Sequence, residues 1–195
     1  MEQNDILEIF EKTQGLLEGH FLLSSGMHSL QYFQCARVLQ YPQYAEELAD
    51  DIASHFTNKD VDLVISPAMG GLIIGHEVAR DLKARFVFTE RSSDSGEMAL
   101  RRGFDLEEGE KALVVEDVLT TGGSVREVVK LLQKENVEVV GVGFIVDRSS
   151  GKVKFSMPKY AILELPVVVY QPEECPLCEK GIPIDRPGSR KKKLI

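Results

Sequence analysis

The chain has 195 residues, of which 43% are hydrophobic and 28% charged, and its formal net charge is −8. This length favours one compact domain, and the composition excludes a chain that is disordered as a whole. The acidic balance argues against nucleic acid as the main partner, because binding its backbone needs clustered positive charge. The longest apolar run, 137–146, is too short to span a membrane, and no N-terminal apolar secretion segment is visible. We therefore expect a cytoplasmic protein without a membrane partner or a disulfide framework.

The first 40 residues combine a helix with a pair of strands. Apolar residues at helical spacing predict an amphipathic helix over 4–14, with Asn4 or Asp5 as its N-cap and Gly15 as its stop. Residues 21–23 and 30–34 flank a segment rich in serine and glycine, which predicts two short strands around a turn. We expect this part to fold back as a small cap.

From Pro42 onward, predicted helices alternate with predicted strands. The expected helices span 42–56, 72–82 and 122–133, and the expected strands span 63–65, 84–88, 112–115 and 137–146. Short, almost continuously apolar strands alternating with helices predict a parallel sheet covered on both faces, so the fold class is α/β. The part from Tyr160 is expected to add one or two strands before a Pro-rich, loosely structured end.

The segment 112–124 carries the strongest functional signal, and it reads Ala-Leu-Val-Val-Glu-Asp-Val-Leu-Thr-Thr-Gly-Gly-Ser. An apolar strand is followed by two carboxylates and by a hydroxyl- and glycine-rich turn that opens a helix. Ligands of open α/β sheets bind beyond the carboxyl ends of the strands. We expect the backbone N–H groups of 121–124, helped by the helix dipole, to hold one phosphate group.

Glu116 and Asp117 distinguish this loop from an ordinary phosphate loop. Two adjacent carboxylates would repel a phosphorylated ligand unless ribose hydroxyls or a hydrated Mg²⁺ lay between them. We therefore expect Mg²⁺ as a cofactor, held by Glu116 and Asp117 directly or through water. A Walker loop is excluded because its Gly-Lys-[Ser/Thr] is missing. The structural alternative is a helix-capping turn after a buried strand.

These thirteen residues resemble the phosphoribosyl diphosphate (PRPP) motif of type I phosphoribosyltransferases. The resemblance implies a central parallel sheet flanked by helices in a single domain, 1–195. It also implies a small hood, mainly 1–40 with C-terminal contributions, over a core of about 41–170. Asp117 is expected to take part in catalysis as well as in binding. The residues implied in binding PRPP are Glu116, Asp117, Val118, Leu119, Thr120, Thr121, Gly122, Gly123 and Ser124.

Further segments resemble one branch of that family, the orotate phosphoribosyltransferases. The resemblance implies transfer of ribose 5-phosphate from PRPP to orotate, which gives orotidine 5′-monophosphate and pyrophosphate in UMP synthesis. Thr120 and Arg148 would contact the orotate, since a planar guanidinium suits a carboxylate-bearing pyrimidine. A surface arginine that ends a strand is the alternative for Arg148. The resemblance covers about 15–190, and the segments that carry it are 17–26, 66–71, 90–91, 100–104, 146–149 and 187–190.

The polar stretch 90–102 resembles the flexible catalytic loop of the family. The resemblance implies a homodimer in which this loop closes over the pyrophosphate in the neighbouring subunit. Arg91, Arg101 and Arg102 are the cations expected to neutralise the departing pyrophosphate.

The chain departs from the common family pattern at three places. Residues 92–95 are Ser-Ser-Asp-Ser where many members carry lysines and a histidine. Gly70 and Ser24 stand where many members have a lysine. The remaining pattern resembles a branch of the family with a shorter loop.

Two other functions stay open at this point. A purine phosphoribosyltransferase would use the same loop with a different hood. A PRPP-sensing regulator of the same fold would need a nucleic-acid-binding surface, which the sequence does not indicate.

Three further signals are expected to be structural. Cys175 and Cys178 have metal-ligand spacing but no second pair of ligands in the sequence, so we predict a local turn with reduced thiols. The alternative is a zinc or redox site, for which the fold would have to bring Cys35 or a histidine to the pair. The basic run 190–193 is expected to be a solvated tail. The histidines are scattered along the chain, and only the second is a candidate for contact with the substrate; they are His20, His28, His55 and His76.

Overall fold

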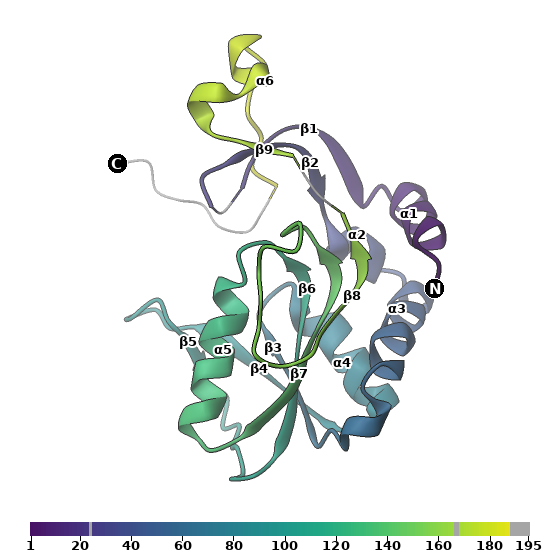
Figure 1. The fold of residues 1–195 in the computed structure, drawn as a ribbon, viewed down its shortest axis with the longest axis vertical. Helices are drawn as coiled ribbons and strands as arrows, with labels where there is room; N and C mark the ends of the chain where they lie inside the picture. The colour runs from purple at the N-terminus through teal and green to yellow at the C-terminus, as the bar shows by residue number, and fades with distance from the viewer. Residues whose placement is uncertain (24, 166–167, 188–195) are drawn as a thin grey trace.

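The computed structural model describes residues 1–23, 25–165 and 168–187. A six-stranded sheet with the order β5-β4-β3-β6-β7-β8 forms its centre (Figure 1). All its neighbouring strands are parallel except β4 and β5, which are antiparallel. The predicted α/β class with a central parallel sheet is therefore confirmed. The strands are β3 (Leu63–Pro67), β4 (Arg85–Arg91), β5 (Met98–Leu100), β6 (Lys111–Leu119), β7 (Glu138–Asp147) and β8 (Lys159–Glu164).

Helices cover both faces of this sheet. Val64 and Leu113 pack into a core with helices α1 to α4, whereas their neighbours Leu63 and Ala112 pack into a second core with α5. Strand side chains alternate between faces, so a sheet covered on both sides needs apolar residues at nearly every position. The helices are α1 (Gln3–Lys12), α2 (Cys35–Leu39), α3 (Pro42–Ser54), α4 (Gly71–Leu82), α5 (Gly123–Lys134) and α6 (Pro176–Glu179), with 3-10 turns at Thr57–Lys59 and Pro172–Glu174.

A second sheet of three strands lies over the carboxyl ends of the central strands (Figure 1). It consists of β1 (Leu16–Leu22), β2 (His28–Phe33) and β9 (Val169–Tyr170). The middle strand, β2, pairs antiparallel with both of the others. Phe21 of β1 also forms a bridge with Asp185. Segments from the two ends of the described chain therefore build this hood together.

The structure corrects several predicted boundaries. The strand predicted over 112–115 continues to Leu119, because apolar residues on both sides of the carboxylates keep pairing with β7. Helix α1 begins one residue earlier than predicted, and Glu2 is its N-cap, with an N–H that donates to the Asp5 carboxylate at 3.2 Å. Its last helical residue is Lys12, three positions before Gly15.

Two regions expected to lack regular structure contain short elements. Strand β5 lies within the stretch expected to be a polar loop, because its three residues pair with the end of β4. The end expected to be loosely structured contains a 3-10 turn and helix α6. Ser24, the basic run 190–193 and most of the motif 187–190 lie outside the described residues.

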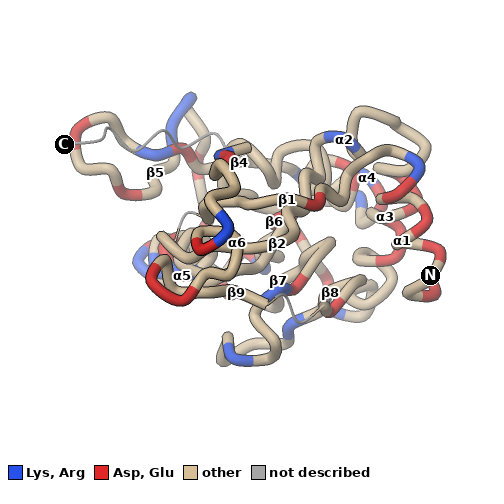
Figure 2. Tube along the Cα trace, turned by 90° about the horizontal axis from the view of Figure 1, so that it is seen from above, with Lys and Arg blue, Asp and Glu red and all other residues tan. Residues whose placement is uncertain are grey.

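Charge is distributed unevenly over the fold. Acidic residues gather along α1 and α3, whereas Lys and Arg occur in the hairpin that projects around β5 (Figure 2). No described helix combines the length and the apolar character that crossing a bilayer requires.

Candidate active site

Three neighbouring strands of the central sheet end at the same edge, beneath the hood. Strand β3 leads into the loop 68–70, β6 carries the two carboxylates and leads into 120–122, and β7 leads into Arg148. Within the sheet, β4 lies on one side of β3, whereas β7 lies on the far side of β6. The order in which successive strands are added to the sheet therefore reverses between β3 and β6. Such a reversal is where open α/β sheets bind their ligands.

A cavity of about 490 Å³ lies between this edge and the hood. This volume is within the range of small-molecule binding sites. The cavity is mixed in character: the hood contributes apolar residues such as Leu22 and Phe33 together with Arg186, and the sheet edge contributes mainly charged and hydroxyl-bearing residues. Its lining comprises Leu22, Leu23, Gly26, Tyr32, Phe33, Gln34, Arg91, Glu116, Asp117, Val118, Thr120, Thr121, Gly122, Gly123, Ser124, Glu127, Arg148 and Arg186.

Most of the site residues predicted from the sequence meet in this cavity. Leu119 does not line it, because its side chain is fully buried in the core. Arg101 and Arg102 are also not among the described residues of the lining. Arg102 instead makes two hydrogen bonds of 2.8 Å to Glu90 in the projecting hairpin. The predicted residues that do line the cavity are Arg91, Glu116, Asp117, Val118, Thr120, Thr121, Gly122, Gly123, Ser124 and Arg148.

The start of α5 forms one wall of the cavity. Gly122 is its N-cap and has a φ of 73°, a left-handed conformation that residues with a side chain rarely adopt. A Cβ at this position would also lie 3.0 Å from the side chain of Val153. The first N–H groups of a helix have no partner within the helix, and they lie at the positive end of its dipole. This wall can therefore bind an anion such as a phosphate group.

The Asp117 carboxylate lies against the loop that follows β3. A Cβ added to Gly70 would be 2.5 to 2.6 Å from three atoms of this carboxyl group, so a side chain at position 70 would displace it. Gly70 therefore leaves room for the carboxylate. Burial raises the pKa of Asp117, although the Val118 N–H donates to its Oδ1 at 2.8 Å. A bound cation or sugar hydroxyl would stabilise the charged form.

Arg148 is a buried cation that also lines the cavity. Its Nη2 donates to the Ser29 hydroxyl at 3.2 Å and to the Gln31 carbonyl at 3.1 Å, and the guanidinium lies 5.7 Å from the ring centre of Phe33. Burial lowers its pKa, and its Nε is buried without a hydrogen bond in the described structure. Burying an unsatisfied donor is costly, so this nitrogen is suited to binding an acceptor on a ligand.

Arg91 is held in place within the cavity wall. Its guanidinium makes hydrogen bonds of 3.0 and 3.2 Å to the two carboxylate oxygens of Glu127, and one of these oxygens also accepts the Met98 N–H at 3.0 Å. The sequence interpretation did not include Glu127. Its position three residues after Ser124 would have placed it on the same face of α5.

Other lining residues were also missed. The sequence around Tyr32 and Arg186 contains no pattern that predicts their place in the cavity lining. Both residues belong to the hood, so they line the cavity only because the hood lies over the sheet edge. Arg186 follows Asp185, whose backbone N–H and carbonyl pair with β1 at 2.7 and 2.9 Å. His20 and His28, which are separate in the sequence, lie together in the structure, with His20 Nε2 and His28 Nδ1 3.0 Å apart. Neither is among the described lining residues, and contact of His28 with the substrate stays a prediction.

Known proteins resemble this chain in both sequence and fold. Residues 37–177 match the family model described as a phosphoribosyl transferase domain. The chain is 54% identical over 192 residues to the orotate phosphoribosyltransferase of Caldicellulosiruptor bescii, covering 98% of this chain and 100% of that protein. It is also 54% identical over 190 residues to the orotate phosphoribosyltransferase of Chlorobium phaeobacteroides, covering 97% of each.

Solved structures share the architecture at lower identity. The crystal structure of orotate phosphoribosyltransferase from Aeropyrum pernix superposes with a TM-score of 0.69 and 23% identity, covering 82% of this chain and 93% of that chain. Identity at this level supports the fold alone.

Proposed function

Because this chain belongs to the phosphoribosyltransferase family, we propose that it transfers the ribose 5-phosphate group of PRPP to N1 of orotate. The products are orotidine 5′-monophosphate and pyrophosphate, a step of UMP synthesis. The observation that carries the choice of orotate is the buried Arg148, whose unpaired Nε belongs to the same cavity as the helix start that can bind a phosphate.

The loop 120–124 would hold the 5′-phosphate of PRPP through the amides at the start of α5. In the reaction, the bond from the anomeric carbon to the diphosphate breaks, and a bond from N1 of orotate to that carbon forms. Positive charge develops on the ribose as the diphosphate leaves. Glu116 and Asp117 would orient the ribose hydroxyls and stabilise this charge from the floor of the cavity.

The same two carboxylates fit a Mg²⁺ site. They supply hard oxygen ligands, and burial raises the pKa of Asp117, so a cation beside it would stabilise its charged form. When bound, Mg²⁺ supplies positive charge to the diphosphate.

Orotate would lie between the hood and Arg148. Its carboxylate offers acceptors to the unpaired Nε of Arg148, and Thr120 provides a hydroxyl group within the same cavity. A purine lacks a carboxylate, so it would leave this donor unsatisfied. We place the reaction in the cytoplasm, and the three free cysteines are in keeping with a reducing compartment.

We further propose a homodimer in which the hairpin around β5 acts on the partner's cavity. This proposal gives a role to Arg101 and Arg102, which are not among the described residues of the cavity in their own subunit. The test is to mix an Arg101→Ala/Arg102→Ala variant with an Asp117→Asn variant, each inactive alone. Random exchange gives one intact site in half of the dimers, so activity should return to about a quarter of the wild-type value. If activity does not return after subunit exchange, the shared loop is refuted.

The function itself is tested by following the loss of orotate absorbance with PRPP, with and without Mg²⁺. A parallel pyrophosphate-release assay would compare orotate with hypoxanthine, adenine and uracil. We expect turnover with orotate and with none of the other three bases, and only when Mg²⁺ is present. Turnover with a purine but not with orotate would refute the choice of acceptor. Binding of PRPP without turnover of any base would support a regulatory protein instead.

A further inference from the structure

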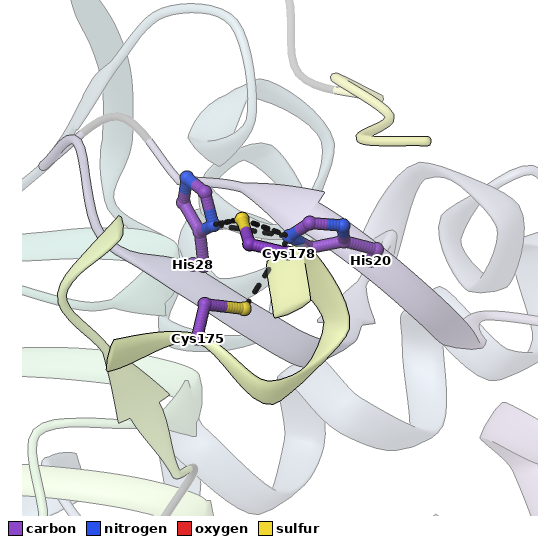
Figure 3. Close-up of side chains that lie close together, drawn as sticks. All are labelled: His20, His28, Cys175 and Cys178. Atoms are coloured by element: carbon purple, nitrogen blue, oxygen red, sulfur yellow. Dashed lines mark hydrogen bonds between the residues drawn. The ribbon is translucent and has the colours of Figure 1, made fainter. Parts of the chain in front are cut away.

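Two histidines of the hood and two cysteines near the C-terminal end of the described chain form a compact cluster outside the cavity. His20 and His28 come from the neighbouring strands β1 and β2, whereas Cys175 is the N-cap of α6 and Cys178 lies within that helix. The four candidate ligand atoms lie within 4.8 Å of one another. Figure 3 shows the four side chains pointing toward a common centre. The sequence interpretation allowed a zinc site only if the fold brought further ligands to the cysteines, and the structure places two histidines beside them.

Four of the distances between the candidate ligand atoms come within about 0.3 Å of those around a tetrahedral zinc ion. His20 Nε2 and His28 Nδ1 are 3.0 Å apart, and the Cys175 Sγ is 3.5 Å from His20 Nε2. The Cys178 Sγ is 3.7 Å from His20 Nε2 and 3.3 Å from His28 Nδ1. Zinc bonds of about 2.3 Å to sulfur and about 2.0 Å to nitrogen at tetrahedral angles separate neighbouring ligand atoms by roughly 3.3 to 3.8 Å. Little movement is needed to admit the ion.

We propose that His20, His28, Cys175 and Cys178 bind one zinc ion as a structural site of the Cys₂His₂ type. Two thiolates and two imidazoles form a ligand set that favours zinc over Mg²⁺, which prefers oxygen ligands. Four protein ligands complete the tetrahedral shell and leave no position for a substrate or a reactive water.

The surroundings of the cluster prepare the ligands for a metal. The Nδ1 of His20 lies 2.8 Å from the Ile182 carbonyl, which only accepts, so this nitrogen carries the proton and Nε2 keeps its lone pair for coordination. His20, His28 and Cys175 are buried, with 4%, 7% and 1% of their surfaces exposed. These ligands are therefore largely shielded from water.

The backbone around the cysteines presents both thiols on one side. Cys175 is the N-cap of α6, and Pro176 occupies the first helical position. The Cys175 carbonyl accepts the Glu179 N–H at 3.1 Å, and the Cys178 carbonyl accepts the Gly181 N–H at 2.9 Å. The C-x₂-C spacing of structural zinc sites thus occurs here on a tight, hydrogen-bonded turn.

The site would fasten the last described segment to the hood. That segment already pairs with β2 through β9 and with β1 through Asp185, and it delivers Arg186 to the cavity. These backbone contacts are few, and α6 is only four residues long. A zinc ion shared between α6 and the two hood strands would supply the stability that so short a segment lacks.

The test measures metal in the full chain under reducing conditions. The protein is stripped with a chelator, incubated with Zn²⁺, freed of unbound metal and analysed by mass spectrometry. We expect about one zinc per chain, as four ligands define one site. Cys178→Ser and His28→Gln should lose this zinc, whereas the controls Cys35→Ala and His76→Gln should keep it. Cys35 lies in the core with α2, and the His76 side chain is 66% exposed.

Cobalt provides a second measurement that does not require any variant to fold. Co²⁺ bound to the reduced wild-type protein should show thiolate charge-transfer absorption, and Zn²⁺ should displace it. Zinc should also slow proteolytic cleavage within 171–187, while Mg²⁺ at the same concentration should not. The proposal is overturned if the reduced wild-type protein retains no zinc and shows no cobalt–thiolate absorption. It is equally overturned if Cys178→Ser and His28→Gln retain as much zinc as the wild type.

Discussion

Replacing Arg148 by alanine should weaken the binding of orotate much more than the binding of PRPP. In the proposed complex, the guanidinium donates to the orotate carboxylate from a buried position, where water does not compete for the interaction. A hydrogen bond to a charged group contributes about 1.5 to 3 kcal/mol, and about 1.4 kcal/mol corresponds to a factor of ten. The KM for orotate should therefore rise about tenfold to hundredfold, with a KM for PRPP close to that of the wild type.

The same substitution should cost little folding stability. Arg148 donates to Ser29 and Gln31, and each lost hydrogen bond contributes about 1 kcal/mol. The Gln31 carbonyl keeps another donor, the Ser29 hydroxyl at 2.8 Å. Removing a buried charge also relieves its desolvation, which offsets part of the loss. The free energy of unfolding should fall by less than about 2 kcal/mol, measured by urea denaturation.

Steady-state kinetics with each substrate varied in turn would decide this prediction. Arg148→Lys should give an intermediate KM for orotate, because lysine keeps the charge but lacks the planar fork. Arg37→Ala is the matched control, since Arg37 is exposed and donates to the Gln14 carbonyl at 3.0 Å. An unchanged KM for orotate in Arg148→Ala, or an equal rise for PRPP, would refute the assigned role.

Two further predictions concern the loop that follows β6. Burial raises the pKa of Asp117, so the native state binds this proton more tightly, and stability falls as the pH rises from the usual carboxyl pKa through the raised one. At pH 7, Asp117→Asn should thus unfold at a urea concentration equal to or higher than that of the wild type, while it loses most of its turnover. A variant that loses stability to urea together with turnover would contradict this. Gly122→Ala should cost about 1 to 2 kcal/mol through left-handed strain and also weaken PRPP binding in calorimetry. Gly109→Ala is the control, because Gly109 has a φ of 81° and an added Cβ would meet no other atom. It should lose a similar free energy of unfolding but keep its affinity for PRPP.

The sequence predicted the central layers well because their signal is local. Apolar strands followed by helices specify a covered parallel sheet, and the motif 112–124 lies at the edge where such a sheet binds ligands. The extent of β6 was less predictable. Glu116 and Asp117 looked like the start of a loop, yet Glu116 pairs with Phe144 of β7 and remains in the strand.

Features that depend on distant pairing could not be derived from local patterns. The hood requires β2 to pair with β9 and β1 to pair with Asp185, and the segment between these contacts brings the Cys175 thiol to His20, 155 positions away. Strand β5 has three residues and follows a turn rich in serine and glycine, so no periodicity marks it. The Met98 N–H at its start is bound by Glu127 of α5, a tertiary contact that has no sequence signature.

The shared construction of the hood has a consequence for synthesis on the ribosome. All strands of the central sheet and the helices that cover it have left the ribosome once Glu164, the last residue of β8, has emerged. The core can therefore fold at that stage. Strand β9 and Arg186 are made later, and the two early hood strands remain without their third strand until then. A nascent chain arrested before Val169 would thus hold a folded core beneath an incomplete hood, and the cavity would be complete only after 169–186 had been made.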